Sequence, residues 1–336
     1  MSDPAQPDRG NTGDSRDTGN TGDSRDSGDT APEQPAAPTR TTLDAPTVRA
    51  LLQEQHPDLA ALPLHPVTGG WDNQLWRLGD EFAVRVPCTG RASELLRKEL
   101  HWLPRLAPDL PLPVPRPLRA GTPSERFPRP WAVTTWIPGE PSDRAAITRP
   151  AHAADTLARF LLALHRPAPA DAPPGTGRGT PLAEEQDLFD HRIRILGPAG
   201  LAADSPSVRS LWKDASSAPE YRGPRLWLHG DLHPANVVVT DGTLSGVLDF
   251  GDLSTGDPAA DLAAAWVLLP VGSATRLFDA YGPVDRATVR RARGRALLCA
   301  LSLISVGLAW ERGLPGGQPT WGPAGRAALE RVLASA

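Results

Sequence analysis

The chain of 336 residues is long enough for two modest domains, which hold about 100 to 200 residues each. It carries 35 basic and 39 acidic residues, and because residues 1–40 contain four of the bases and eight of the acids, the remainder is neutral and lacks the basic excess of a nucleic-acid binder. Its two cysteines are too few for a disulfide scaffold, which favours a reducing compartment.

Residues 1–40 contain a tandem repeat, GNTGDSRDT followed by GNTGDSRDS, made of small polar and charged residues. Such a segment cannot bury enough apolar surface to offset the conformational entropy lost on ordering it. We therefore expect a disordered low-complexity tail over residues 1–40. Its composition favours a passive solubilising extension over a partner-binding segment.

Residues 41–135 alternate short strand and helix patterns. The segments NQLWRLG and EFAVRVP flank a Gly-Asp turn, which predicts a β-hairpin. The next segment, RASELLRKELHWLPRLA, has leucines at helical spacing, so it predicts a helix. Glu99 lies on the same face of this helix as the leucines, which is an unusual place for a charge.

A proline-rich stretch, DLPLPVPRPLRAG, favours an extended connector over a helix, a central strand or a PxxP ligand. PWAVTTWIPGEP then predicts a strand that ends at a Pro-Gly break, which is typical of a hinge. We therefore expect an N-terminal lobe over 41–135, and the hinge with a C-terminal lobe over 136–336. In the second lobe, AADTLARFLLALH predicts an amphipathic helix.

Residues 228–239, LHGDLHPANVVV, lead into a second predicted hairpin, in which two apolar runs flank an Asp-Gly turn. Antiparallel pairing brings the start of the first strand beside the end of the second, so Asn236 and Asp249 should meet at the open end. Asp231 lies just upstream. Three oxygen-bearing side chains thus converge, and Mg2+ takes oxygen ligands.

HGDLHPANVVV, followed by LDFGD and GDPAADLA, resembles the aminoglycoside phosphotransferase family, whose relatives include choline kinases and, more distantly, protein kinases. The spacing of Asp231 and Asn236 matches the H-R-D-x-x-x-x-N pattern, with Gly230 in place of the arginine. The resemblance covers about residues 62–266. It implies an α+β, bilobal protein kinase-like fold with a small N-terminal β-sheet lobe and a larger, mainly helical C-terminal lobe.

The resemblance also implies an activity: transfer of the γ-phosphoryl group of ATP or GTP to a hydroxyl of a small molecule, such as an aminoglycoside or related antibiotic. Carried over by position, Asp231 is the catalytic base, Asn236 and Asp249 hold Mg2+, and His229 and Asp261 brace the catalytic loop. Taken alone, Asp231 could cap a turn and Asn236 could bond the backbone. All of them together favour catalysis.

Two neighbouring aspartates have other interpretations. Asp257 precedes a proline and a helical segment, so it is typical of a helix N-cap. Asp252 could be a second metal contact or a solvent-exposed charge.

Phosphoryl transfer also needs a cation on the phosphates. The chain has two lysines, Lys98 and Lys213, and neither lies on the strand where kinases carry V-A-I-K. Arg85 occupies that strand position, and the resemblance implies that it binds phosphate and pairs with Glu99. The alternative is an exposed strand arginine and a solvated helix glutamate.

The segment VTGGWDNQLWRL contains Gly69 and Gly70, whose lack of side chains allows the backbone to approach phosphates closely. The resemblance implies that this is the nucleotide-binding loop. It also places Thr135, Trp136 and Ile137 at the hinge, where backbone groups would bond the edge of an adenine or guanine. The sequence leaves ATP and GTP both open.

Two other functions stay open. His229, Asp231 and His233 form an H-x-D-x-H pattern that suits Zn2+ or Mn2+ in a hydrolase, but this interpretation gives Asn236 and Asp249 no role. A pseudokinase-like module would bind nucleotide without transferring phosphate. Such modules usually lack the base or the metal ligands, and both are present here.

The C-terminal half should supply the acceptor pocket. The acidic residues of LAEEQDLFD suit a cationic acceptor, although a charged helix face is the simpler interpretation. Trp266, Trp310 and Trp321 could line an apolar pocket, although a buried tryptophan more often belongs to a core. The sequence leaves the acceptor and the oligomeric state open.

The apolar run from Ala296 to Trp310 is shorter than the roughly 18 residues needed to span a bilayer, so it predicts a buried helix. The first residues are polar and lack the pattern of a secretory signal. We expect a cytoplasmic protein that does not partner a membrane.

Overall fold

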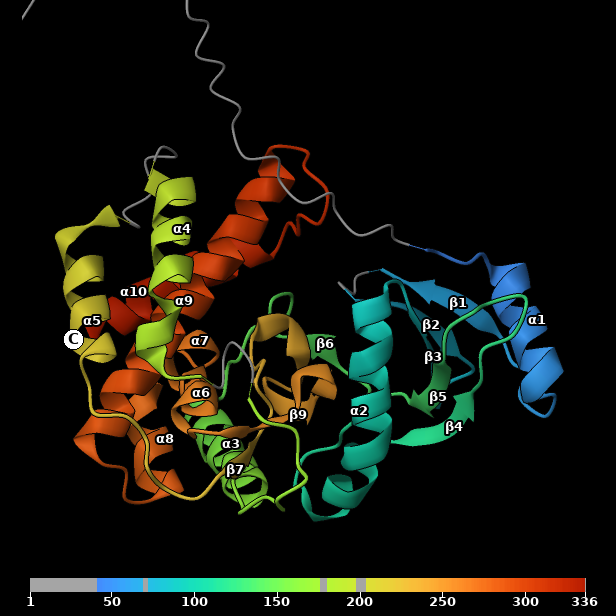
Figure 1. The fold of residues 1–336 in the computed structure, drawn as a ribbon, viewed down its shortest axis with the longest axis horizontal. Coiled ribbons are helices and arrows are strands. Elements are labelled where there is room, and N and C mark those ends of the chain that lie inside the picture. The colour runs from blue at the N-terminus through green and yellow to red at the C-terminus, as the bar shows by residue number, and fades with distance from the viewer. Residues whose placement is uncertain (1–40, 69–71, 176–179, 198–203, 336) are drawn as a thin grey trace, which may run out of the picture. The chain divides into compact units, whose positions relative to one another are not determined.

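The computed structural model describes residues 41–68, 72–175, 180–197 and 204–335 (Figure 1). The predicted disordered tail over 1–40 and the predicted loop glycines Gly69 and Gly70 lie outside the described residues. All elements below belong to the unit formed by residues 39–336.

The smaller lobe is built on an antiparallel five-stranded sheet with the strand order β1-β2-β3-β5-β4. Glycine at position 79 has a positive φ of 58° in the turn between β2 and β3, so the predicted hairpin is confirmed. The strands are β1 (Leu64–Val67), β2 (Asn73–Leu78), β3 (Phe82–Pro87), β4 (Pro117–Gly121) and β5 (Trp131–Thr135).

Strand β4 comes from the proline-rich segment that the sequence predicts to be an extended connector. It lies at the edge of the sheet, where a proline costs no ladder hydrogen bond on its outer side. A Cβ atom at Gly121 would lie 2.0 Å from the Trp131 ring, so the glycine lets β4 pass close to that side chain. The segment is therefore extended, as predicted, and its end contributes a strand.

Helix α1 (Ala45–Gln55) covers the small sheet. It begins after Asp44, whose side chain accepts a hydrogen bond from the Thr47 backbone at 3.0 Å. Its buried residues pack with those of the sheet to form the core of the smaller lobe: Val48, Leu51, Leu52, Trp76, Leu78, Val84, Val86, Phe127, Trp131 and Val133.

Helix α2 (Gly90–Leu106) confirms the predicted helix after the first hairpin. The Thr89 side chain caps it by accepting from the Ala92 backbone at 3.1 Å. Its buried face includes Leu96, Leu103 and the carboxylate of Glu99, as the leucine pattern predicts. The helix lies between the small sheet and the larger lobe (Figure 1).

The larger lobe is mainly helical and holds two short antiparallel sheets, β10-β7 and β6-β8-β9. The predicted amphipathic helix is present as α3, and its apolar residues Leu157, Phe160, Leu161 and Leu164 are fully buried. The elements of this lobe are β6 (Glu140–Pro141), α3 (Pro150–Leu164), η3 (Leu182–Glu185), α4 (Gln186–Leu196), α5 (Pro206–Ser216), β7 (Leu226–Leu228), η6 (Pro234–Asn236), β8 (Val237–Thr240), β9 (Thr243–Val247), η7 (Phe250–Asp252), β10 (Ser254–Gly256), α6 (Ala259–Leu262), α7 (Ala264–Val267), α8 (Ser273–Tyr281), α9 (Arg286–Glu311) and α10 (Trp321–Ala334), where η marks 3₁₀ turns.

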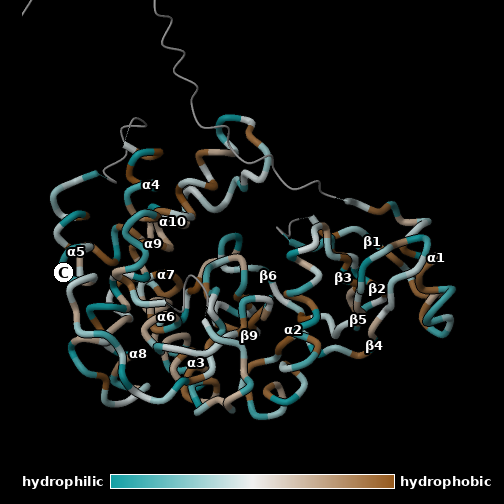
Figure 2. The backbone as a smooth tube through the Cα atoms, viewed as in Figure 1, coloured by the Kyte–Doolittle hydropathy of each residue, from teal (hydrophilic) through white to brown (hydrophobic). Residues whose placement is uncertain are grey.

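Helix α9 contains the long apolar run. Among the described residues it is the one helix long and apolar enough to cross a membrane by length and composition, and 56% of that apolar window is buried inside the protein. Leu297 and Leu301 are fully buried, and α9 packs against α10 and α5. The predicted buried helix is therefore confirmed, and apolar stretches gather between the helices of this lobe (Figure 2).

Candidate active site

The β8–β9 hairpin assembles one side of the site. Its turn residues Asp241 and Gly242 both have positive φ angles, 51° and 74°, which suits a tight two-residue turn. Pairing of Val237 with Val247 sets the register, and the Leu248 backbone donates to the Asn236 carbonyl at 2.7 Å. The open end of the hairpin therefore carries the two predicted metal ligands, as the sequence implies.

Asn236 is also tied to the loop that precedes it. Its Nδ2 donates to the Asp231 carbonyl oxygen at 3.0 Å and lies 3.4 Å from Asp231 Oδ2. The amide oxygen of Asn236 is consequently directed away from this contact. The structure thus brings Asp231 and Asn236 together, with a defined orientation for each side chain.

Asp261, on α6, holds the start of this loop. Its two carboxylate oxygens accept from the backbone nitrogens of His229 at 2.7 Å and Gly230 at 2.9 Å. Burial by itself raises the pKa of the Asp261 carboxyl, but hydrogen bonds from His165 and Gly230 and the nearby His229 outweigh burial and hold that pKa below its ordinary value. Asp261 is therefore a charged, buried anchor.

His229 is fully buried and uses both ring nitrogens. Its Nδ1 accepts from the Asp231 backbone at 3.1 Å, so Nε2 carries the proton that it donates to the Leu248 carbonyl at 2.9 Å. Burial lowers the pKa of His229, which keeps the ring neutral. The imidazole joins the loop of Asp231 to the loop of Asp249.

This geometry removes the basis for a hydrolase metal cluster. The ring nitrogens of His229 are occupied, and His233 Nδ1 accepts from the Ala235 backbone at 3.3 Å. Within the described ranges, no group of three His, Cys, Asp or Glu side chains is arranged to hold a metal ion. The H-x-D-x-H interpretation of the sequence is therefore not supported.

Gly230 stands where protein kinases carry an arginine, and the structure gives the reason. Its φ is 80°, and a Cβ atom there would lie 2.6 Å from the carbonyl oxygen of Asp252. Only glycine allows the backbone of the catalytic loop to approach the turn η7 this closely.

Asp249, the predicted metal ligand before η7, adopts the left-handed conformation with a φ of 57°. Its Oδ1 accepts from the Gly251 backbone at 3.2 Å and lies 3.5 Å from Arg85 Nη2. The side chain keeps 47% of its surface exposed, so part of the carboxylate is open to a ligand. The Asn236 amide oxygen and the Asp249 carboxylate are hard oxygen donors, so the donor set fits Mg2+.

Arg85 on β3 and Glu99 on α2 form a buried ion pair. Arg85 is 6% exposed and Glu99 is 0% exposed, and Arg85 Nη1 contacts Glu99 Oε1 directly. The alternative of an exposed arginine and a solvated glutamate is therefore wrong. Burial opposes the charge on Arg85, but Glu99 and Asp249 outweigh it and raise the Arg85 pKa. Burial raises the pKa of Glu99, and Arg85 only partly offsets that effect.

Two of the three predicted hinge residues have backbone N–H groups that are already hydrogen-bonded within the protein. The backbone nitrogen of Thr135 donates to the Arg116 carbonyl at 2.9 Å, and that of Trp136 donates to the Glu81 carbonyl at 2.7 Å. These two N–H groups are therefore already used within the small lobe. Ile137, which is 8% exposed, follows them and remains the hinge position whose backbone N–H could meet a base.

Sequence reasoning missed His165, which follows α3. Its Nε2 lies 3.2 Å from Asp261 Oδ2, and its Nδ1 lies 2.9 Å from the Tyr281 hydroxyl. Burial, followed by the charge of Asp261, raises the pKa of Tyr281 to about 12. A signal was present, because His165 falls four residues after Leu161 and so continues the buried face of the helix.

The contacts of Asp257 and Asp252 decide between the interpretations that the sequence offers for them. Asp257 lies one residue before the N-cap position, which Pro258 occupies; its Oδ1 still accepts from the Ala259 backbone at 3.0 Å, and the carboxylate pairs with Arg291 at 2.6 Å. Asp252 Oδ1 lies 3.5 Å from Arg91 Nη2. Asp252 is therefore half of a partly exposed ion pair between the larger lobe and α2.

The acidic residues of LAEEQDLFD and the three tryptophans considered for an acceptor pocket are scattered, and two of them follow the simpler interpretation. Glu185 is buried and pairs with Arg295 at 3.3 Å, so it is committed to the fold, and Trp266 belongs to the core. Trp310 is 55% exposed. The Trp321 ring lies 4.8 Å from the His233 ring, and His233 Nε2 is 3.6 Å from Asp231 Oδ2. Trp321 is thus the tryptophan next to the catalytic loop.

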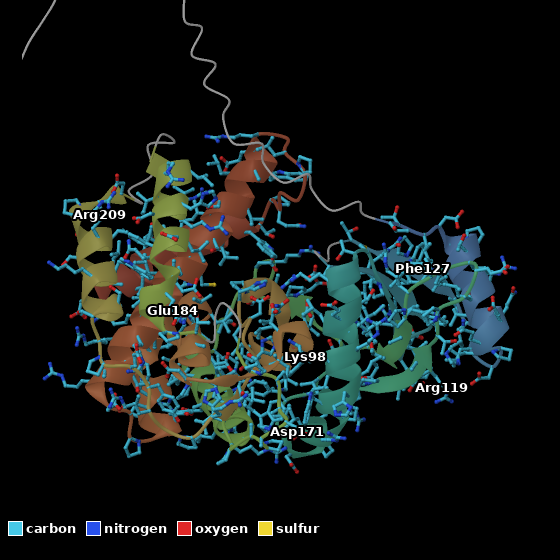
Figure 3. All side chains as sticks on the ribbon, viewed as in Figure 1. Lys98, Arg119, Phe127, Asp171, Glu184 and Arg209 are labelled. Atoms are coloured by element: carbon cyan, nitrogen blue, oxygen red, sulfur yellow. The ribbon has the colours of Figure 1, made fainter. Side chains whose placement is uncertain are left out.

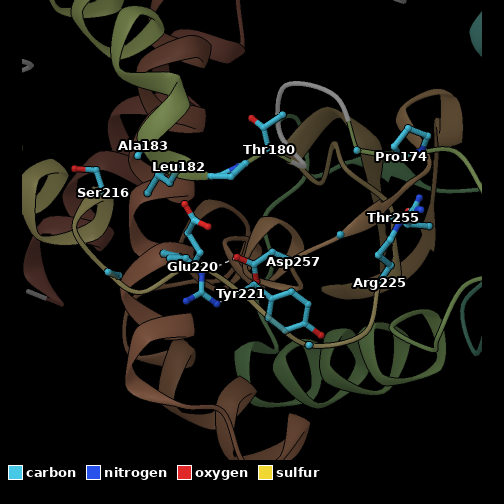
Figure 4. A pocket seen from close by; sticks show the side chains of 16 residues that line it. Pro174, Thr180, Leu182, Ala183, Ser216, Glu220, Tyr221, Arg225, Thr255 and Asp257 are labelled. Carbon is cyan, nitrogen blue, oxygen red and sulfur yellow. Dashed lines mark hydrogen bonds and ion pairs between the residues drawn. The ribbon is translucent and has the colours of Figure 1, made fainter.

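A cavity of about 370 Å³ lies elsewhere in the larger lobe, at the end of the β7–β10 pair that is remote from the catalytic loop (Figure 4). Asp257, Tyr221 and Arg225 are among its lining residues. Asp231, Asn236 and Asp249 do not line it. The cavity is therefore separate from the cluster described above.

Residues 63–297 match the model of the phosphotransferase enzyme family. The chain is 27% identical over 158 residues to an aminoglycoside 3'-phosphotransferase of Escherichia coli, covering 45% of this chain and 58% of that protein. It is 33% identical over 191 residues to a homoserine kinase of Gluconacetobacter diazotrophicus, covering 51% of this chain and 48% of that protein. The chain thus spans about half the length of these relatives.

Solved structures show the same architecture. The GDP complex of wild-type aminoglycoside 2'-phosphotransferase-IIIa superposes with a TM-score of 0.64 at 19% identity, covering 87% of this chain and 99% of that chain. A macrolide 2'-phosphotransferase type I superposes with a TM-score of 0.57 at 19% identity, covering 87% and 98%. At these identities the likeness shows the fold, so the predicted bilobal, protein kinase-like α+β fold is confirmed.

Proposed function

Because this chain belongs to the phosphotransferase enzyme family, we propose that it transfers the γ-phosphoryl group of ATP or GTP to a hydroxyl group of a small molecule. The observation that carries the proposal is the convergence of Asp231, Asn236 and Asp249 beside the buried pair of Arg85 and Glu99. Phosphoryl transfer needs a base, metal ligands and a cation, and this cluster supplies each of them.

The base is Asp231. Its carboxylate accepts the proton of the acceptor hydroxyl while that oxygen forms a bond to the γ-phosphorus and the bond to the bridging oxygen of the nucleoside diphosphate breaks. His233 Nε2, 3.6 Å from Asp231 Oδ2, supports the orientation of this carboxylate. Asp261 supports it from behind by fixing the backbone of the two preceding residues.

The metal ligands are Asn236 and Asp249, which would hold Mg2+ against the nucleotide phosphates. When bound, the cation neutralises phosphate charge. Arg85 lies next to Asp249 and adds a fixed positive charge beneath the same phosphates, while Glu99 holds its guanidinium in place. Most of the rate enhancement then comes from positioning and electrostatics.

The nucleotide would bind between the lobes, with the hinge from Thr135 to Ile137 along its base. Since the N–H groups of Thr135 and Trp136 are already bonded, Ile137 is the proposed backbone donor to the base. ATP and GTP are both candidates, and both donors occur in the cytoplasm, where we place the reaction.

For the acceptor we propose a hydroxylated antibiotic, because relatives that carry aminoglycoside and macrolide phosphotransferase names share the sequence or the fold. The acceptor hydroxyl must reach Asp231. Trp321 meets the His233 ring edge-on beside this residue, so its ring would form one wall of the acceptor site. A flat aromatic wall suits the apolar face of a sugar ring.

The test is phosphate transfer from ATP or GTP with Mg2+ to a panel of aminoglycosides, macrolides and homoserine, with mass spectrometry of the products. We expect a product 80 Da heavier than one acceptor class, roughly the mass of one added phosphoryl group replacing a proton. The same product from Asp231→Ala at an equal rate would refute the assignment of the base. Nucleotide binding without any product across an extended panel would favour a binding module.

A further inference from the structure

Helix α2 presents one face to the segment formed by Asp249 and η7, which we call the metal-binding loop. Arg91 and Leu95 lie one turn apart on this helix, and Lys98 follows three residues later. Arg91 Nη2 is 3.5 Å from Asp252 Oδ1, and a Cβ atom at Gly251 would lie 3.4 Å from Leu95 Cβ. The helix therefore rests directly on η7, and Lys98 lies on this side of the helix (Figure 3).

Two of the three cations around this contact are already paired. The Arg85 guanidinium contacts Glu99 through Nη1 and lies 3.5 Å from Asp249 through Nη2. The Arg91 guanidinium lies 3.0 Å from Asp72 and 3.5 Å from Asp252. Both cations thus already have carboxylate partners on two sides.

Lys98 is different. It is half-buried, and no residue in the described ranges forms a hydrogen bond or ion pair with its ammonium group. Burial lowers the pKa of Lys98, and the charges of Asp252, Glu99 and Asp249 act in the opposite direction. The ammonium group therefore interacts electrostatically with Asp249 and Asp252 of the metal-binding loop, although neither carboxylate forms an ion pair with it.

We propose that Lys98 is a second phosphate-binding cation, which contacts the terminal phosphates of the nucleotide beside η7. This inference rests on the proposed function and adds a binding residue to it. A lysine ammonium on a flexible four-carbon stem can adjust to a charge that arrives and leaves. Arg85 cannot do so, because moving its guanidinium would leave the fully buried Glu99 without its partner.

The contacts of Arg85 and Lys98 indicate different roles for these two cations. Arg85 keeps its buried pairing with Glu99 through the cycle and lies 3.5 Å from Asp249 across the two lobes. Lys98 supplies the unpaired positive charge. Lys98 is one of only two lysines among the 35 basic residues of the chain.

The second lysine is a matched control. Lys213 is exposed on α5, which lies on the far side of the larger lobe from α2 (Figure 1). The test compares Lys98→Met, Lys98→Arg and Lys213→Met by calorimetric titration with the magnesium complexes of ATP and GTP. Each variant is first checked by circular dichroism and its melting temperature.

We expect Lys98→Met to bind its nucleotide about tenfold or more weakly, the effect of losing one charge-assisted contact. Lys98→Arg keeps the positive charge and should therefore recover part of the nucleotide affinity. If Lys98 had only a structural role, nucleotide affinity would not depend on whether the charge is kept. Lys213→Met should match the wild type.

A second measurement uses the wild-type chain alone and does not depend on any variant folding. The protein is acylated with an amine-specific reagent, with and without the magnesium nucleotide, and modification at each lysine is read by peptide mass spectrometry. We expect the nucleotide to protect Lys98 and to leave Lys213 unchanged.

The outcomes separate two failures. In the first, the wild type binds nucleotide, Lys98→Met binds it with unchanged affinity, and the nucleotide does not protect Lys98. This result overturns the role of Lys98 and leaves the proposed function standing. No binding of either nucleotide by the folded wild type overturns the proposed function, and the role of Lys98 falls with it.

Discussion

Asp261 Oδ2 lies 2.7 Å from the backbone nitrogen of His229, across 32 residues of sequence. The same oxygen lies 3.2 Å from His165 Nε2, and Oδ1 accepts a hydrogen bond from the Gly230 backbone nitrogen at 2.9 Å. One buried carboxylate thus satisfies three donors from two separate segments. The loop from His229 to Asp231 depends on this carboxylate for its position.

Asp261→Asn should therefore destabilise the protein by about 3 kcal/mol, because an amide offers one acceptor oxygen and directs its NH2 group at backbone donors. The free energy of unfolding in urea measures this. Asp155→Asn is the control, because Asp155 forms an exposed pair with Arg276 at 2.7 Å and should matter little. Equal stability of the two variants would contradict the anchoring role.

The stability of the protein should depend on pH through His229. Its pKa is lowered in the folded state, whereas the unfolded chain binds a proton near pH 6.5. Below that pH the unfolded state binds more protons, so the free energy of unfolding falls as the pH drops toward the folded pKa, by up to about 1.4 kcal/mol per pH unit. His229→Gln should show a shallower slope between about pH 6.5 and 5. An identical slope would mean that this ring titrates normally.

Asp231→Asn should reduce kcat by roughly a hundredfold or more, the usual contribution of a general base, while the affinity for nucleotide stays nearly unchanged. Steady-state kinetics and calorimetry separate the two quantities. Asp241→Asn at the hairpin turn is a suitable control, because asparagine also tolerates the left-handed conformation found there. Loss of nucleotide binding in Asp231→Asn would instead indicate a disturbed fold.

Asp249→Asn tests the metal site without backbone strain, since asparagine accepts the φ of 57° that this position requires. In the wild type, Mg2+ should tighten nucleotide binding. In the variant this effect of Mg2+ should shrink by roughly tenfold or more, because a charged ligand is lost. Titration with nucleotide in Mg2+ and in EDTA measures the difference. Full retention of the Mg2+ effect would remove Asp249 from the ligand set.

Glu99→Gln should cost roughly 3 kcal/mol of stability, because it removes the buried carboxylate partner of Arg85 and leaves only the partly exposed Asp249 beside that charge. Glu94→Gln, at an exposed position on the same helix, should change little. The double change Arg85→Met with Glu99→Leu should recover stability in urea unfolding yet bind nucleotide poorly. Normal nucleotide affinity in the double variant would show that the pair is only structural.

The sequence predicts the parts of this molecule that local geometry decides. The two hairpins follow from their turn residues, because Gly79 and the Asp241-Gly242 pair adopt the left-handed conformation that few other residues accept. Antiparallel pairing then places Asn236 near Asp249 without knowledge of the rest of the fold. The Arg85–Glu99 pair is predicted by the family resemblance, and the charge on the apolar face of a helix is consistent with it.

Other parts depend on contacts that no local pattern contains. His165 meets Asp261 across 96 residues, and periodicity identifies the buried face of a helix without naming its partner. The hinge N–H groups of Thr135 and Trp136 are consumed by neighbouring carbonyls, which depends on the packing of the sheet. Lys98 gave no signal, because its setting is made by η7, more than 150 residues away in the chain.

The close approach of Gly230 to the Asp252 carbonyl also bears on how the spent nucleotide leaves. At Gly230 no side chain separates the loop of Asp231 from η7, and the His229 ring bonds both loops, so we expect them to move as one body. In the proposed reaction, product release would depend on how far the five-stranded sheet and α2 move away from that body. The Arg91–Asp252 and Arg85–Asp249 contacts are the interactions that this movement must break, and their strength would set the pace of turnover.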